Sequence, residues 1–201
     1  MKLSSLSKIQ TLIIVFTAVS LLSACTSNNN AAPSNSQSSS GMTNNGMMGN
    51  QSSLSAADIM FLQMMIPHHE QAIEMSKLAV TNTKNSDVLD LAARIEAAQQ
   101  PEIELMKKLL TDAGQSVMPD HGMGDNGMMN DGDMVALAAA KDSEFDVLYL
   151  KGMMAHHEGA ITMANGVSDS SNQDVNTLAN NIISSQTAEI AEMSKLLAAA
   201  S

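Results

Sequence analysis

The sequence contains a single cysteine, Cys25, and no tryptophan, and aromatic residues make up 2% of its 201 positions. One cysteine cannot form an intrachain disulfide or a zinc site with several thiolates. Basic residues are also scarce, since ten Lys and Arg stand against 21 Asp and Glu, for a net charge of −11. An acidic chain with few aromatic rings is poorly suited to nucleic acid or to an anionic lipid surface. Nucleic acid is therefore excluded as an expected partner.

The position of the cysteine predicts an exported lipoprotein. Lys2 and Lys8 precede an apolar segment, residues 11–22, which is too short to span a membrane, and small residues lead up to Cys25. We interpret residues 1–24 as a signal peptide similar to those of bacterial lipoproteins. Lipidation of Cys25 would then anchor the protein in the periplasm or at the cell surface. An ordinary signal peptide with an incidental cysteine is the alternative.

Two parts follow the signal peptide. Residues 25–53 are rich in Asn, Ser and Gly and include three methionines, but they contain little that could be buried. We expect a flexible stalk there. Residues 54–201 are long enough for one compact domain. Cleavage before Cys25 removes two lysines and leaves eight basic and 21 acidic residues, a net charge of −13.

One stretch occurs twice in the domain. Residues 58–75 and 146–163 share the pattern D-x-x-[F/Y]-L-x-x-M-x-x-H-H-E-x-A-I-x-M and contain four of the five histidines. The copies lie 88 residues apart, and a second similarity, between residues 87–110 and 174–197, follows at an offset of 87. A tandem duplication explains both.

The periodicity of these segments is helical throughout, with apolar residues three and four positions apart. Ser55 with Asp58 and Ser143 with Asp146 resemble capping boxes, Ser86 is a candidate cap for the next helix, and Gly114 is a candidate helix end. Each half is therefore expected to be a helical hairpin. The predicted fold is all-α, a ferritin-like four-helix bundle built from two tandem hairpins. A short helix is expected over residues 134–140, after a Met-rich loop, residues 115–133.

The repeated residues converge on one helix face. At about 100° per residue, Met65 and Ala72 lie near the centre of this face, and His68 and His69 flank it. The second copy places its histidines in the same way. On the following helices, Gln99 and Glu102, and likewise Gln186 and Glu189, lie on an otherwise apolar stripe and need polar partners, for which imidazole is suited.

This pattern predicts a metal site. A lone buried histidine is usually a core residue with satisfied hydrogen bonds, and a lone Met is usually core filler, but a symmetric set favours ligands. The candidate ligands are Met65, His68, His69, Met75, Met153, His156, His157 and Met163. The residues expected to orient them, or to join them as ligands, are Asp58, Asp146, Gln99, Glu102, Gln186 and Glu189.

The donor set is imidazole and thioether without thiolate. Thioethers favour Cu(I) and by extension Ag(I), while imidazole also suits Cu(II) and zinc. Seven methionines lie in the expected stalk and loop, where there is no core to fill, and Met134 follows directly after the loop. We interpret part of the loop as a second, looser site for copper capture. Its candidate residues are Met118, His121, Met123, Met128 and Met129.

Several enzyme classes lack their motifs in this sequence. The order H-H-E excludes the H-E-x-x-H zinc peptidases, and no E-x-x-H is present for a di-iron centre. Neither a phosphate-binding glycine loop nor a nucleophile in a familiar setting occurs. The sequence therefore predicts a binding protein without catalytic residues.

The doubled motif, with the Gln99-x-x-Glu102-Ile103-x-x-Met106 helix, resembles a bacterial family of exported ferritin-like four-helix proteins filed as a domain of unknown function. The resemblance covers about residues 55–197. It implies an up-and-down bundle. Since some members are associated with periplasmic copper binding and copper resistance, it also implies copper. By position, the family's motif residues fall on the eight candidate ligands above.

The resulting hypothesis is a lipid-anchored extracytoplasmic protein that binds copper for buffering, resistance or transfer to a partner protein. Cu(I) is the expected ion, and Ag(I) or Cu(II) are further ions that the site is expected to bind. Two alternatives stay open. One is a ferritin-like redox or hydrolytic metalloenzyme, and the other is a surface interaction lipoprotein whose histidines are structural. The sequence does not decide whether the copies share one site or form two.

Overall fold

The computed structural model of the protein describes residues 53–118 and 126–199, and in this part of the chain all regular structure is helical. The expected signal peptide, nearly all of the expected stalk, and His121 and Met123 of the loop lie outside the described residues. The prediction of an all-α bundle is confirmed. The helices are α1 (Ala56–Asn82), α2 (Ser86–Asp112), α3 (Asp131–Ala139), α4 (Asp142–Asn165) and α5 (Gln173–Ala199).

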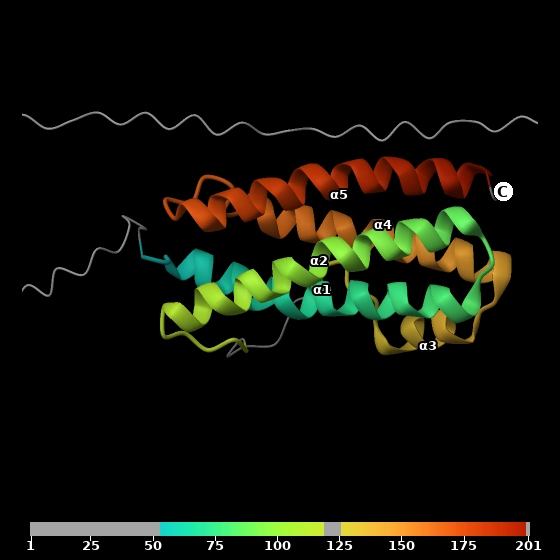
Figure 1. Cartoon of the computed structure of the whole chain (residues 1–201), viewed down its shortest axis with the longest axis horizontal. Helices are drawn as coiled ribbons and strands as arrows, with labels where there is room; N and C mark the ends of the chain where they lie inside the picture. The colour runs from blue at the N-terminus through green and yellow to red at the C-terminus, as the bar shows by residue number, and fades with distance from the viewer. Residues whose placement is uncertain (1–52, 119–125, 200–201) are drawn as a thin grey trace, which may run out of the picture. The chain divides into compact units, whose positions relative to one another are not determined.

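The four long helices run along one common direction (Figure 1). α1 packs on α2 and α4 packs on α5, so each half of the duplication is a hairpin, and the hairpins join chiefly through α1 and α4. The short α3 lies outside the bundle against α1 and α4. None of the described helices is long and apolar enough to cross a membrane.

The helix ends follow local chemistry. Ser55 and Asp58 form the expected capping box at the start of α1. The expectation for α2 is wrong, because Asn85 caps this helix through its side chain and Ser86 is already helical. α2 ends as expected, with Gly114 at φ +68°, and the amides of Gly114 and Gln115 bond back to the carbonyls of Thr111 and Leu110. This pair of hydrogen bonds is the Schellman motif, which favours glycine because residues with a side chain are strained at positive φ.

The second capping box expected from sequence does not form. α4 begins earlier, after Lys141, and no side chain caps it. Asp146 lies inside the helix, and its carboxylate accepts a hydrogen bond from the side-chain amide of Asn85 at 2.9 Å. α1 continues through Pro67 and α2 through Pro101.

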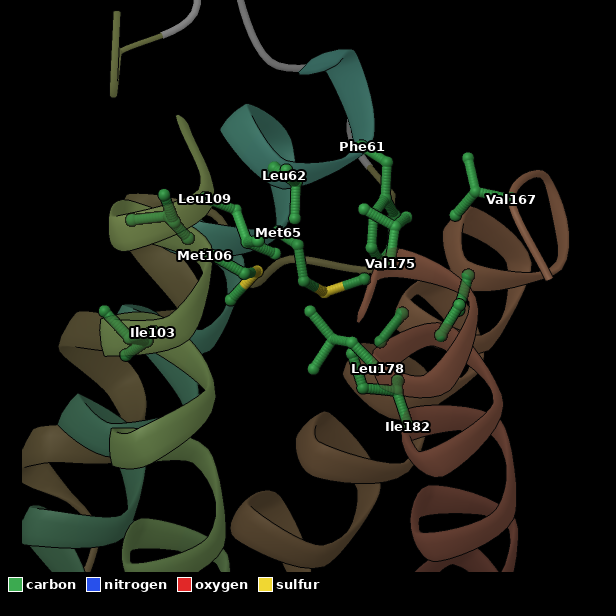
Figure 2. Close-up of a cluster of buried hydrophobic side chains, with 14 of the residues drawn as sticks. Phe61, Leu62, Met65, Ile103, Met106, Leu109, Val167, Val175, Leu178 and Ile182 are labelled. Atoms are coloured by element: carbon green, nitrogen blue, oxygen red, sulfur yellow. The ribbon is translucent and has the colours of Figure 1, made fainter. Parts of the chain in front are cut away.

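The apolar core consists of two clusters. Figure 2 shows the first, where Met65 lies among side chains of α2 and α5. Its labelled members are Phe61, Leu62, Met65, Ile103, Met106, Leu109, Val167, Val175, Leu178 and Ile182. The second cluster is built around Met75, Leu91, Tyr149, Met153 and Met193. On α1 and α4 the histidine pairs lie between the residues of these two clusters.

Candidate metal centre

The two histidine pairs meet where α1 crosses α4. The imidazole rings of His68 and His156 have centroids 3.7 Å apart. Further along, Ser76 Oγ lies 3.1 Å from the hydroxyl of Tyr149. Because Ser76 follows His68 and Tyr149 precedes His156, the helices run antiparallel. α1 and α4 are equivalent helices of the two copies. When such helices run antiparallel, equivalent residues face each other only at the twofold axis that relates the copies. The four histidines therefore form one cluster on this axis.

Three of the four imidazoles are oriented by a hydrogen bond from Nε2. His69 donates to Glu102 Oε2 at 2.8 Å, and His157 donates to Glu189 Oε2 at 2.7 Å. These two contacts are equivalent in the two halves. His68 instead donates to the backbone carbonyl of Asn126 at 3.0 Å, in the loop before α3. A carboxylate that holds one imidazole nitrogen is the usual support of a metal-bound histidine, since it leaves the other nitrogen as a lone-pair donor.

The remaining imidazole nitrogens are buried without partners. All four histidines are at most 1% exposed. Nδ1 of His68, His69, His156 and His157, together with Nε2 of His156, makes no hydrogen bond. Buried polar atoms without partners are costly, and native proteins rarely retain them without a ligand or water. These imidazole nitrogens are therefore the atoms of the cluster that are left for a ligand or a water molecule.

Burial keeps the rings of His68 and His156 neutral. Desolvation is the main reason that the pKa of His68 falls from 6.5 to about 4, and the nearby His69 and His157 lower it further against the opposing effect of the Asn126 carbonyl. Desolvation likewise places the pKa of His156 well below its ordinary value, with the other histidines adding to the effect. Only a neutral imidazole binds a metal ion, so both side chains are in the ligand form at neutral pH.

Two glutamines, Gln99 on α2 and Gln186 on α5, form an equivalent pair on the other two long helices. Arg94 Nη2 bonds to Glu192 Oε1 at 2.6 Å, which sets the register of the antiparallel α2 and α5. Five residues along α2 and six back along α5, Gln99 and Gln186 reach the same level, one turn from Glu102 and Glu189. Both amides are buried, and both polar atoms of Gln99 and Oε1 of Gln186 lack partners. Both glutamines therefore hold unpartnered amide atoms in the interior, one turn from the glutamates that bind His69 and His157.

The methionines differ in their relation to the histidines. Met65 and Met153 are fully buried and stand one turn before His68 and His156. Met75 is also fully buried, but it follows His68 by two turns. Its counterpart Met163 is half-buried and packs on the first apolar cluster. Met65 and Met153 are thus the thioethers placed closest to the histidines along their helices.

Other candidate residues lie elsewhere. The carboxylate of Asp58 accepts a hydrogen bond from the backbone amide of Ser55. Asp58 lies ten residues, or about 15 Å along α1, from His68. Asp146 is bonded to Asn85 near the far end of the bundle. Neither aspartate contacts the histidines, which corrects the expectation that they orient the ligands. Met118 is 71% exposed, while Met128 and Met129 are half-buried against α4.

The imidazoles alone do not form a complete cage. Across residues 53–118 and 126–199, no group of three or more His, Cys, Asp or Glu side chains is arranged to hold a metal ion. An ion in the cluster would therefore need another donor besides these residue types. The thioethers of Met65 and Met153 are suited to that role because they are neutral, soft and buried nearby.

Sequence reasoning missed the segment that covers His68. Residues 126–130, which we call the strap, lie across α1 and α4. Gln71 binds the backbone of Met129 on both sides, donating to its carbonyl at 2.8 Å and accepting from its amide at 2.9 Å. A Cβ at Gly159 would lie 1.6 Å from the Asn126 carbonyl oxygen. The sequence contained one sign of this segment: Gln71 and Gly159 occupy equivalent positions of the repeat but are different residues.

The chain matches one family model over residues 58–197, which is more than half of its length. The family is described as "Domain of unknown function (DUF305)". A DUF305 protein from Streptomyces coelicolor, described as secreted, has a similar solved structure, with 32% identity and a TM-score of 0.69. That similarity covers 72% of this chain and 92% of the other.

The protein CopM is also similar in structure. Its Cu(II)-bound form has 30% identity and a TM-score of 0.62, over 70% of this chain and 95% of CopM. CopM has further been solved in Cu(I)-bound and silver-bound forms, with TM-scores of 0.59 and 0.58. Among curated sequences, an uncharacterized protein of Acanthamoeba polyphaga mimivirus is 44% identical over 55 residues. The match spans 36% of that viral protein and 27% of this chain.

Proposed function

The chain belongs to the DUF305 family, and from this premise we propose that it is an exported, lipid-anchored protein that binds copper for buffering, resistance or transfer to a partner protein. Cu(I) is the preferred ion in this proposal, with Ag(I) as a chemical equivalent and Cu(II) as a weaker ligand. The protein binds and releases the ion without catalytic turnover.

One observation carries the proposal. Four buried imidazoles meet on the axis of the duplication, and each keeps an unpartnered Nδ1. Glu102 and Glu189 hold the Nε2 atoms of His69 and His157, which leaves Nδ1 as the nitrogen of each ring that can bind an ion. Monovalent d10 ions accept low coordination numbers, so a pair of imidazoles with a thioether is a sufficient donor set. The similarity to CopM, whose solved forms carry copper and silver, supports the same chemistry.

The candidate ligands divide into three groups in this proposal. His68, His69, His156 and His157 supply imidazole, and Met65 and Met153 supply the thioethers closest along the helices. Met75 and Met163 stand a further turn away. Glu102 and Glu189 orient two of the rings, and Gln99 and Gln186 bound the polar interior on the side of α2 and α5.

Replacement of all four histidines by alanine tests the site. The mature chain with Cys25→Ser, which removes the only thiol, is titrated with Cu(I) without oxygen against a chromophoric chelator. Tight binding should be lost in the quadruple variant, with helicity checked by circular dichroism. The milder His68→Gln and His156→Gln variants address a failure to fold. Binding equal to that of the parent in every variant would refute the assignment.

Export and anchoring are tested separately. The small residues before Cys25 motivate the proposal, and the similar Streptomyces protein is described as secreted. In cells, Cys25→Ser should move the protein from the membrane fraction to the soluble extracytoplasmic fraction. Metabolic labelling with a fatty-acid analogue should mark the parent and not the variant. An unlabelled parent would favour the alternative of an ordinary signal peptide.

A further inference from the structure

Two equivalent positions of the repeat, Gln71 on α1 and Gly159 on α4, hold the strap against the helices in different ways. Gln71 of α1 bonds both the amide and the carbonyl of Met129. At the equivalent position of α4, Gly159 has no side chain, and the Asn126 carbonyl occupies the space that a Cβ would fill. Gly127, at φ +77°, also lies in close contact, since its Cβ would lie 2.2 Å from the Ala155 carbonyl oxygen. The duplicated positions have therefore diverged so that one holds the strap and the other admits it.

This seating brings a second thioether to Met75. A Cβ at Gly152 would lie 2.9 Å from Sδ of Met129 and 3.4 Å from the methyl carbons of both Met129 and Met75. The methyl carbons of the two methionines therefore both lie next to the space that a Cβ at Gly152 would fill. Met75 is fully buried and Met129 is half-buried. Met129 is the outer member of the pair.

The pair lies beside an opening to solvent. A surface pocket of about 310 Å³ is formed between the strap, α3 and α4. Its lining includes Met128, Met129, Asp133, Lys151, Gly152 and Ala155. Met129 therefore faces the pocket and also touches the same glycine as Met75, which belongs to the core.

The other half of the duplication lacks this arrangement. The position equivalent to Gly152 is Met64, and the position equivalent to Met75 is Met163, which is half-buried. The strap is thus an addition to the symmetric bundle on one side. Met129 packs on the second apolar cluster, and the side chain of Gln71 fixes its backbone by donating to its carbonyl and accepting from its amide.

We propose that Met75 and Met129 form a separate two-thioether site for a soft monovalent cation, Cu(I) or Ag(I), between the surface pocket and the histidine cluster. This inference rests on the proposed function and extends it by a capture site outside the cluster. The same strap carries the Asn126 carbonyl that orients His68. A cation that shifts Met129 therefore acts on the strap that holds one imidazole of the inner site.

The test follows methionine methyl groups directly. The full mature chain with Cys25→Ser is labelled with ¹³C at the methionine methyls and titrated with Ag(I). Two resonances should shift early, and they should be absent from Met75→Leu and Met129→Leu, respectively. Each variant should weaken Ag(I) binding at this site by about tenfold or more, since loss of a residue that only supports a ligand already costs about 10- to 100-fold. Met134→Leu, a half-buried methionine of the same apolar cluster, is the matched control and should bind as the parent does.

A second variant leaves every sulfur in place. Gly152→Ala puts a methyl group against Met129 Sδ, which should displace this flexible side chain and weaken the site at little cost in stability. Replacement of the four histidines should leave the two methyl shifts intact. If the parent binds Cu(I) through its histidines while Met129→Leu, Met75→Leu and Gly152→Ala all bind Ag(I) unchanged, this inference is wrong and the proposed function stands. A parent that binds neither ion overturns both.

Discussion

At the scale of single residues, the four histidines differ in what holds them. His69 and His157 donate to carboxylates, His68 donates to a backbone carbonyl, and His156 has no partner on either nitrogen. His156 also lies against His68, with the ring centroids 3.7 Å apart.

The carboxylate partners give the first prediction. Glu102→Gln and Glu189→Gln replace a charged acceptor by an amide and weaken the hold on the Nε2 proton of the neighbouring histidine. Each should lower Cu(I) affinity by about 10- to 100-fold in a competition titration. The matched control is Glu70→Gln, because Glu70 adjoins His69 in sequence but is exposed and pairs with Lys107 at 2.9 Å. Equal affinity in Glu70→Gln and Glu102→Gln would contradict the orienting role.

The second prediction concerns pH. The pKa of His68 is about 4 in the folded protein against 6.5 ordinarily. Between these values the unfolded chain binds a proton that the folded chain does not. Burial of neutral His68 carries no protonation cost above about pH 6.5, and the free energy of unfolding falls by roughly 3 kcal/mol for this residue as the pH drops to 4. His156 acts in the same direction.

Urea unfolding of the metal-free protein at several pH values measures this effect. His68→Gln should show a shallower loss of stability between pH 6.5 and 4 than the parent does. The carboxylates titrate in both proteins, so the difference between them isolates His68. Parallel pH profiles would rule out a neutral, buried His68.

At the scale of elements, the strap depends on close backbone contact. Gly159→Ala would place a Cβ 1.6 Å from the Asn126 carbonyl oxygen, so the strap must lift away from α4. We expect the unfolding free energy to fall by about 1–3 kcal/mol, as for other overpacked sites. The gain in helix propensity from Gly to Ala, up to about 1 kcal/mol, opposes this only in part.

The control for this substitution is Gly166→Ala. Gly166 is exposed, has φ −66°, and its Cβ would approach only the Met163 carbonyl, at 3.3 Å. Chemical denaturation should therefore separate the two alanine variants. If both unfold at the same urea concentration, the strap is not held tightly against α4.

At the scale of the whole molecule, the antiparallel crossing of α1 and α4 makes one cluster from two motifs. A shared cluster predicts that His68 and His69 replaced together, or His156 and His157 replaced together, abolish all histidine-dependent Cu(I) binding. Two independent sites predict that each double variant keeps half of the stoichiometry. Equilibrium dialysis with metal analysis distinguishes these outcomes.

Binding should also stabilise the folded bundle as a whole. An ion that binds only the folded state at 100 times its Kd adds about 2.7 kcal/mol. The Tm should therefore rise with added Ag(I) in the parent and much less in the quadruple histidine variant. An unchanged Tm in the parent would favour the alternative in which the histidines are structural.

The sequence alone was sufficient to predict the fold class and the helix faces that point into the bundle. Periodicity predicted two hairpins, and the apolar stripe predicted that Glu102 and Glu189 need polar partners, which are His69 and His157. These features are local, since they depend on which side of one helix a residue occupies. The same local reasoning misplaced Asp58 and Asp146, because a shared helix face does not specify the distance along the helix.

The meeting of the two copies was decided only by tertiary structure. Whether His68 faces His156 depends on the direction and register of α1 against α4, and these are set by packing between segments far apart in sequence. The seating of the strap is likewise a contact between distant segments, since Asn126 and Met129 lie 58 residues from His68 and Gln71, their partners on α1. Helical periodicity is a property of neighbouring residues, so it cannot specify which helices meet, or at which residues.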